Sequence, residues 1–350
     1  MKSLKKTSYP TNINPAHLIK LSSPRGIIEF CRGNTPDYAS TYNVDDNSRA
    51  ALAAGKLYRL TKRKFYLKLF EQYLHFLSRH VNGHFPVRHG FVRSLGLTRE
   101  PITQDSLGRL LWASSWILSR EDFSAYHNKA VPLFLFSLAR YLKFTHVRPT
   151  AYAVCGLSEL AAVTPAEELR QSIVLGAEKL CDALTKNKKN GWAWFENVLT
   201  YENARPPQAL YAAYEATGEE KYLKRAEVSL AFLRSVVFME RVFVPVGADE
   251  WYRQGRNRPL YVQQPVEAGA MCECLVRAYK VTGNKNYLRE ARLCMDWYGG
   301  KNTRKACMVN PKDGGVYDGI NENNVTGNQG AEATLSYLLG ACALQEAEDG

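Results

Sequence analysis

The chain has 350 residues, 45% of them hydrophobic, and a formal net charge of +12. This composition excludes intrinsic disorder and suffices for one large hydrophobic core or two of medium size. No run of about 18 apolar residues suggests a membrane span, and the basic first residues lack the apolar stretch of a secretory signal, so we expect a cytoplasmic protein.

The lysine and arginine residues are spread along the chain rather than gathered in one stripe, so we expect no nucleic-acid partner. The eight cysteines are scattered through apolar segments, a pattern typical of free, buried thiols in a reducing compartment. Cys272 and Cys274 are two positions apart on a predicted helix and point to different faces, which argues against a zinc site. We expect neither a metal nor an organic cofactor.

Repeated segments in the sequence predict two kinds of helix. The segments that begin at Thr61, Thr217 and Thr282 each contain a Tyr-Leu pair followed by apolar residues at intervals of three and four. This spacing predicts amphipathic outer helices that cover a core with one face. Segments of Ala, Gly and Leu with few charges predict inner helices that other helices surround. They begin near residues 46, 106, 150, 206, 265 and 328.

Together these helices predict six helical hairpins. The sequence ends soon after the sixth inner helix, so residues 13–30 are expected to supply its outer partner. No linker rich in Pro, Gly or Ser divides the chain, and no alternating strand pattern is long enough to oppose a helical fold. We predict an all-α, single-domain (α/α)6 toroid over residues 14–350, preceded by a flexible extension over residues 1–13.

The loops that lead into the inner helices are the richest in aromatic and polar residues. Parallel inner helices bring their N-termini, with positive dipoles and free N–H groups, to one end of the ring, where we expect a polar funnel. Flat aromatic faces beside polar groups suit a carbohydrate. The aromatic residues expected to face sugar rings are Trp192, Trp194, Trp251, Tyr252 and Tyr317.

The acidic residues at the predicted helix starts have both structural and functional interpretations. Asp45 or Asp46 can cap the first inner helix, but capping needs only one of two adjacent carboxylates. Glu267 fits a capping box if Gln264 caps the helix and Pro265 is its first residue.

Glu332 lies among small residues, behind a predicted cap at Thr326 or Asn328. A carboxylate there is costly unless the protein uses it or an arginine such as Arg49 or Arg205 pairs with it.

The stretch YENARPPQAL, residues 201–210, combines a helix start with a polar cluster. Pro206 and Pro207 fit the first helical turn, where a missing N–H costs little. Glu202, Asn203 and Arg205 then lie at the helix mouth. Because capping needs only one of them, the group also indicates a site that holds a hydroxylated ligand and tunes an acid.

Five motifs carry a family resemblance: NVDDNSRAAL, PTAYAVCGL, WFENVLTYENARPPQAL, QQPVEA and NQGAEATLSYLLG. In this order they resemble a bacterial family of the six-hairpin glycosidase superfamily, over residues 14–345. Members of that family are often labelled only as hypothetical or glycosyltransferase-associated, and the resemblance implies neighbours such as mannoside phosphorylases. It implies the toroid fold and carbohydrate chemistry, but no particular catalytic pair.

We hypothesise a glycoside hydrolase that acts on a short oligosaccharide, for which the resemblance suggests mannose. Such an enzyme needs one carboxylic acid and one carboxylate. Glu202 or Glu332 is the expected acid, with a pKa raised by burial, and Asp45 or Asp46 the expected base. Opposite walls of a funnel would favour inversion. The expected substrate-binding residues are Arg49, Trp192, Trp194, Glu196, Tyr201, Asn203, Arg205, Tyr252, Gln263, Gln264, Glu267, Tyr317, Asn328 and Gln329.

Alternative functions use the same toroid. A sugar epimerase or isomerase would use histidines for proton transfer, but the seven histidines lie outside the five motifs. A lyase acting through tyrosines, or a toroid that binds sugar without catalysis, also fits the pattern. Terpene cyclisation is disfavoured because Asp45 and Asp46 lack a wider acidic metal motif, and lanthipeptide cyclisation because no Cys and His zinc set is visible. No oligomeric state follows from the sequence.

Overall fold

The structure is a computed structural model, and it describes residues 13–81, 91–93, 96–97 and 102–349. The predicted extension falls almost wholly outside this range, since residues 1–12 are not described. Alternating inner and outer helices dominate the described part. The inner helices are α2 (Val44–Thr61), α4 (Gln104–Leu118), α6 (Val147–Ala161), α8 (Arg205–Thr217), α10 (Pro265–Thr282) and α12 (Ala331–Asp349).

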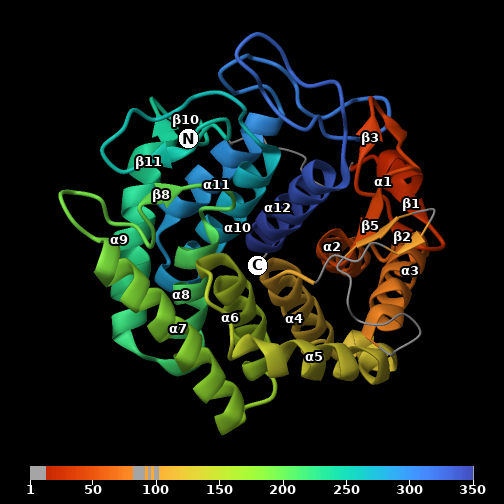
Figure 1. The fold of residues 1–350 in the computed structure, drawn as a ribbon, viewed down its shortest axis with the longest axis horizontal. Helices are drawn as coiled ribbons and strands as arrows, with labels where there is room; N and C mark the ends of the chain where they lie inside the picture. The colour runs from red at the N-terminus through yellow and green to blue at the C-terminus, as the bar shows by residue number, and fades with distance from the viewer. Residues whose placement is uncertain (1–12, 82–90, 94–95, 98–101, 350) are drawn as a thin grey trace.

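The inner helices form a closed ring, as Figure 1 shows. Each contacts the next along the chain, and α12 contacts α2. The outer helices pack around this ring, so the predicted single-domain, all-α toroid is confirmed. They are α3 (Lys64–Val81), α5 (His127–Tyr141), α7 (Glu167–Asn187), α9 (Glu220–Val237) and α11 (Lys285–Tyr298), with the 3-10 helix η1 (Glu121–Tyr126) before α5.

The N-terminal segment fills the sixth outer position only in part. Helix α1 (Ala16–Leu21) contacts α12, but the expected longer helix does not form. The chain turns instead into two short antiparallel pairs, β1 (Ser22–Ser23) with β2 (Gly26–Ile27), and β3 (Cys31–Arg32) with β4 (Thr35–Pro36).

Small residues let the inner helices approach closely. A Cβ atom added at Gly108 would lie 2.7 Å from the Pro149 carbonyl oxygen, and one at Gly156 would lie 2.5 Å from the Trp112 Cα. Both distances are shorter than real Cβ contacts, so these crossings need glycine. The sequence pattern of small residues therefore reflects close packing between neighbouring inner helices.

Short strands tie together the loops at the N-terminal ends of the inner helices. Strand β5 (Thr41–Asn43) runs directly into α2 and pairs with β6 (Phe91–Arg93), which pairs with β7 (Gly96–Leu97). Strands β8 (Val198–Leu199) and β11 (Tyr252–Arg253) join the loops before α8 and α10. The last pair is β9 (Phe238–Met239) with β10 (Val242–Phe243).

The helix starts match the prediction at two positions and differ at one. Prolines occupy the first turns of α8 and α10, and Gln264 is the N-cap of α10, as predicted. The N-cap of α2 is Asn43, whose side chain accepts a 2.6 Å hydrogen bond from the Asp46 N–H. Because Asn43 satisfies that donor, Asp45 and Asp46 are free of the capping role considered for them.

The cysteines carry no disulfide: seven thiols are buried and Cys307 is exposed. No helix within the described residues is long and apolar enough to cross a membrane.

Candidate functional site

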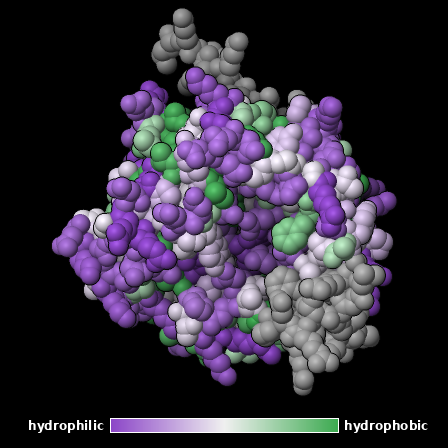
Figure 2. Space-filling model, turned by 45° about the horizontal axis from the view of Figure 1, so that its top comes forward, coloured by the Kyte–Doolittle hydropathy of each residue, from purple (hydrophilic) through white to green (hydrophobic). Residues whose placement is uncertain are grey.

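A cavity of about 360 Å³ opens at the N-terminal ends of the inner helices. The hydrophilic hollow in the space-filling view of Figure 2 lies on this side of the molecule. Among the described residues, the lining contains no lysine, arginine or histidine. It contains the carboxylates of Glu29, Asp45, Asp46, Asp105, Asp318 and Glu332.

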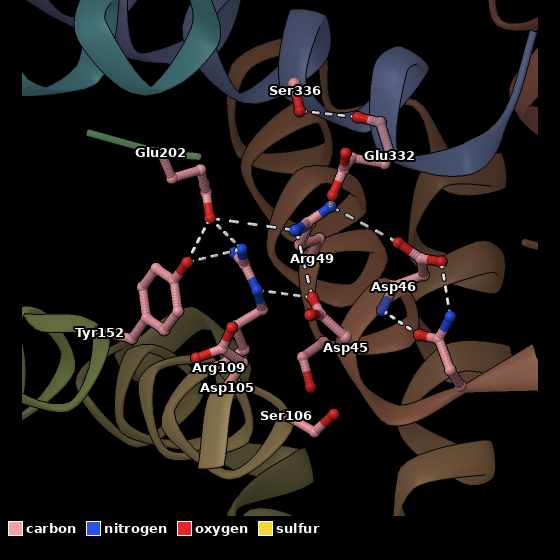
Figure 3. Close-up of polar contacts among 12 residues, drawn as sticks. Asp45, Asp46, Arg49, Asp105, Ser106, Arg109, Tyr152, Glu202, Glu332 and Ser336 are labelled. Atoms are coloured by element: carbon pink, nitrogen blue, oxygen red, sulfur yellow. Dashed lines mark hydrogen bonds and ion pairs between the residues drawn. The ribbon is translucent and has the colours of Figure 1, made fainter. Parts of the chain in front are cut away.

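One buried guanidinium contacts all four carboxylates that the sequence analysis selected as catalytic (Figure 3). Arg49, on the second turn of α2, has a side chain only 6% exposed. Its nitrogens lie 3.2 Å from Asp45, 3.6 Å from Asp46, 3.9 Å from Glu202 and 2.7 Å from Glu332. Arg49 and Glu332, 283 positions apart in the sequence, therefore meet here. This pairing is one of the two considered from sequence for Glu332, with Arg49 or with Arg205.

Glu202 forms the floor of this cluster and differs electrostatically from the expected acid. Its side chain is 1% exposed and does not line the cavity. Burial raises the pKa of Glu202, but Arg109, Arg205 and Arg49 lower it by more. The pKa of Glu202 therefore lies well below its ordinary value. The expected rise in pKa is not found, because burial is accompanied by three cations.

Asp45 and Asp46 are consecutive but have different surroundings. The Oδ1 atom of Asp45 lies 2.6 Å from Arg109 Nε, and its side chain is 26% exposed. Asp46 is 7% exposed and accepts a 2.8 Å hydrogen bond from the Asn43 amide. Burial, opposed in part by Arg49, raises the pKa of Asp46 to about 8. A carboxyl that keeps its proton near neutral pH is equipped to act as a general acid.

Three further wall carboxylates were not singled out from sequence. Burial raises the pKa of Glu29, Asp105 and Asp318. None of the ion pairs found among the described residues includes them, and their partners are the Thr41 hydroxyl, the Tyr201 hydroxyl and the Gly330 N–H. Asp105 stands in the first turn of α4, as Asp45 does in α2, so its position was a usable signal. No comparable signal marks Glu29.

The aromatic residues expected to face a sugar lie elsewhere. Trp192 is 4% exposed, packs against Phe232 and Tyr252, and donates its indole N–H to the Glu196 carbonyl. Trp194 is fully buried. This burial leaves neither indole face free for a sugar. The cavity is lined by a different aromatic residue, Phe30, which is 54% exposed.

Most of the other expected binding residues do not line the cavity. Gln264 lines the cavity, whereas Tyr252 and Tyr317 do not. Asn203 donates to Glu267, whose pKa burial raises to about 7. The remaining contacts are structural: Glu196 with Arg148, Tyr201 with Asp105, Arg205 with Glu273, Gln263 with Trp297, Asn328 with the Gly33 N–H, and the Gln329 backbone with Gly33 and His17.

Within the described part of the chain, no group of three or more His, Cys, Asp or Glu side chains could hold a metal ion. Chemically, the site offers one protonated carboxyl beside carboxylates, above a layer of fixed arginines. That combination suits proton transfer to a leaving oxygen with a carboxylate close by.

Comparisons with known proteins show the fold. No family model and no curated protein matches the sequence. Cellobiose 2-epimerase from Bacillus thermoamylovorans matches with a TM-score of 0.72 and 13% identity, covering 97% of each chain. A D-mannose isomerase matches with a TM-score of 0.70 and 12% identity, covering 98% of this chain and all 100% of the other.

An α-1,6-mannanase from a Salegentibacter species matches with a TM-score of 0.66 and 14% identity, covering 96% of this chain and 98% of the other. Inactive variants of that mannanase, changed at two consecutive aspartates, are also similar and are complexed with α-1,6-mannotetraose and α-1,6-mannotriose. The neighbours therefore include glycosidases as well as sugar epimerases and isomerases.

Proposed function

We propose that the protein is a glycoside hydrolase that cleaves a short, neutral oligosaccharide in the acidic cavity. The observation that carries this proposal is the pair Asp45 and Asp46, which lines the cavity with one member in contact with two guanidiniums and the other with a pKa raised to about 8. A glycosidase needs two carboxyl groups in different protonation states. The mannanase neighbour supports the proposal, since its inactivation at two consecutive aspartates occurs on the same fold.

Asp46 then protonates the leaving oxygen while the glycosidic bond breaks, and Asp45 attacks the anomeric carbon to form a glycosyl ester. Water, deprotonated by Asp46, hydrolyses that ester and frees Asp45. Both aspartates contact nitrogens of the same guanidinium, Arg49, rather than facing each other across the funnel. This arrangement favours the separation of about 5–5.5 Å found in retaining enzymes over the wider gap that admits a water. Retention of configuration therefore replaces the inversion that opposite walls would favour.

Sugar epimerisation or isomerisation is the second candidate, because two of the structural neighbours are a cellobiose 2-epimerase and a D-mannose isomerase. Those reactions need a base that removes a proton from carbon. None of the histidines whose side chains the structure describes, His17, His75, His127 and His146, lines the cavity. The side chain of His80, together with His84 and His89, lies outside the described residues. The described wall thus offers carboxylates for this step.

Incubation with manno- and gluco-oligosaccharides in D₂O separates the two candidates. Hydrolysis increases the number of reducing ends and leaves carbon-bound hydrogen unchanged. Epimerisation keeps the number of reducing ends and introduces deuterium at C2, whereas isomerisation to a ketose introduces it at C1. We expect new reducing ends whose first-formed anomer, followed by proton NMR, retains the configuration of the substrate. Deuterium at C1 or C2 without cleavage would overturn the proposal, and binding without either change would favour a sugar-binding toroid.

A further inference from the structure

The two aspartates of the site differ most in their contacts with Arg109, a residue of α4 that the sequence analysis did not select. Arg109 Nε lies 2.6 Å from Asp45 Oδ1, which Arg49 Nε also approaches at 3.2 Å. Asp46 has no contact with Arg109, and its nearest cation atom is Arg49 Nη1 at 3.6 Å. One aspartate is therefore held between two guanidiniums, and its neighbour meets only one.

Two residues hold the Arg109 side chain in place: Tyr152, on α6, and Glu202, just before α8. Arg109 Nη2 donates to Glu202 and, at 2.9 Å, to the Tyr152 hydroxyl, while Arg109 Cζ lies 4.1 Å from the centre of the Tyr152 ring. The Arg109 side chain is 4% exposed. A planar guanidinium with contacts on its face and on its edge has little freedom to rotate.

Glu202, which anchors Arg109, is itself held in an unusual backbone conformation. Its φ of +43° lies in the left-handed region, which non-glycine residues rarely adopt. Glu267 accepts a hydrogen bond from the Glu202 N–H, and Arg205 Nε contacts Glu202 Oε1 at 3.0 Å. Such conformations persist where surrounding contacts over-determine them, often at functional sites. The carboxylate of Glu202 thus has a fixed position under Arg109.

We propose that Arg109, anchored by Glu202, is a positioning residue that keeps Asp45 ionised and so leaves the proton of the pair on Asp46. The proposal deepens the hydrolase function and rests on it for the catalytic meaning of the pair. Glu202 then acts through Arg109 and has no contact with the substrate. The exchange of protons between adjacent carboxyls is governed by the nearby charges, and an opposite charge in contact stabilises the ionised form.

The charged and titratable groups that face the pair come from every neighbouring segment. Arg49 lies on α2 itself, Asp105 and Arg109 on α4, Tyr152 on α6, Glu202 before α8, and Glu332 on α12. Glu29 approaches from the N-terminal segment and adds to the raised pKa of Asp46. Among these groups only Arg49 and Arg109 are cations. Arg49 touches both aspartates, so Arg109 is the cation that distinguishes them.

Carbon-13 NMR of protein labelled at the aspartate carboxyl carbons tests the proposal without a substrate. Asp45→Asn and Asp46→Asn assign the two signals by their loss. In the wild-type protein we expect the Asp46 midpoint well above the ordinary value of an aspartate. In Arg109→Gln the Asp45 midpoint should rise by about one pH unit or more, so that the two midpoints approach each other. Arg109→Lys, which keeps the charge, should give a smaller rise.

Arg148→Lys is the matched control. Arg148 is another buried arginine on an inner helix, paired at 2.8 Å with Glu196, and it has no contact with either aspartate. In Arg148→Lys we expect the titration midpoints of Asp45 and Asp46 to equal those in the wild-type protein. Circular dichroism establishes which variants are folded, and Arg109→Lys carries the test if Arg109→Gln does not fold. Unchanged midpoints in a folded Arg109 variant, or a wild-type proton on Asp45, would overturn the inference.

The outcome for the positioning role is independent of the outcome for the hydrolase proposal. If no sugar is cleaved but the Asp45 midpoint rises in Arg109→Gln, the positioning role stands and the proposed function falls. If sugar is cleaved, the acidic limb of kcat/KM should move upward with the Asp45 midpoint, because that limb reports the base of the free enzyme. An unmoved acidic limb in an active Arg109 variant contradicts the positioning role alone.

Discussion

The two ends of the helical ring both contain a cavity, but their charges are arranged in opposite ways. At the C-terminal ends of the inner helices, a cavity of about 230 Å³ has glutamates interspersed with Lys56, Arg277 and Lys280. Arg277 pairs there with Glu159 and Glu215, and Lys56 approaches Glu346 at 3.9 Å. At the N-terminal ends, the described lining of the larger cavity has six carboxylates and no cation.

We interpret the paired charges at the C-terminal ends as stabilising the ring, and the carboxyl groups at the N-terminal ends as available for chemistry. At the acidic end, burial raises the pKa values of Glu29, Asp105 and Asp318, which belong to none of the ion pairs found among the described residues. At Asp46 burial also outweighs the contact with Arg49. Perturbed pKa values in a cavity are typical of functional sites. The acidic end therefore carries the proposed site, and the mixed-charge end is expected to be structural. Four experiments test this contrast.

The largest effect is expected on turnover. Asp46→Asn preserves size but cannot donate a carboxylic proton, so kcat on a cleaved oligosaccharide should fall by about a hundredfold or more. Glu215→Gln, at the opposite cavity, should leave kcat within about twofold because it does not reach the substrate. Reducing-end assays measure both. Equal losses in the two variants would remove the functional distinction between the ends.

The second effect concerns the arginine layer between the two cavities. Arg205 contacts Glu202 at 3.0 Å and Glu273 at 2.7 Å with a side chain 4% exposed. Arg205→Met should lower the free energy of unfolding by about 3–5 kcal/mol, because two buried carboxylates lose a partner. Arg277→Met should cost less, since Arg277 is 20% exposed. Urea unfolding of both variants measures the difference, and a larger loss for Arg277 would contradict the ranking.

The third effect is a pH-dependent gain in stability. The pKa of Asp46 rises from 3.8 to about 8, so the folded chain binds a proton that the unfolded chain releases between these values. Its contribution to stability therefore decreases as pH rises through this window. Asp46→Asn removes this loss, and the variant should be more stable than the wild type at pH 8, by at least about 1 kcal/mol, since each unit of the pKa shift corresponds to about 1.4 kcal/mol.

The gain should shrink towards pH 4, because the unfolded chain begins to take up the proton near its pKa of 3.8. Thermal unfolding at pH 4.5, 6 and 8 follows the trend. Asp296→Asn is a control at a partly exposed carboxylate paired with Lys301 at 2.7 Å, and no such gain is expected there. A constant difference across the pH range would show that Asp46 does not titrate in this window.

The smallest effect is expected for the aromatic residue at the acidic cavity. Phe30→Ala should change the free energy of unfolding by less than about 0.5 kcal/mol, because the side chain is 54% exposed, while KM rises several-fold if the ring contacts substrate. Trp194→Ala should instead cost about 3–5 kcal/mol, since that residue is fully buried. An unchanged KM in Phe30→Ala would remove Phe30 from the binding surface.

The fold could be predicted closely because its signals are local. Inner helices expected near residues 206 and 265 begin at Arg205 and Pro265, where prolines mark the first turns. The sixth, expected near 328, begins three residues later at Ala331. Residues 13–30 were harder to predict, since β1 and β2 divide a segment whose composition resembles that of a longer helix.

The site was predicted less completely. Asp45, Asp46 and Glu332 line the cavity, and their adjacency to helix starts is visible in the sequence. Arg109 lies within an inner-helix pattern that gives it no special position, and Phe30 lies in a loop without a motif. Trp192 and Trp194 were selected from sequence but do not face the cavity. An aromatic residue in a loop near a site packs into the core as readily as it faces a ligand.

By itself, the sequence determined the alternation of inner and outer helices and the end of the ring at which acidic residues gather, because periodicity and helix starts depend on near neighbours. Only the tertiary structure decided the state of each carboxyl. Glu202 and Asp46 are both buried, yet three arginines lower the pKa of Glu202, whereas burial outweighs the single contacting Arg49 and raises the pKa of Asp46. These charges come from helices far apart in the sequence, and their balance exists only once the ring has closed.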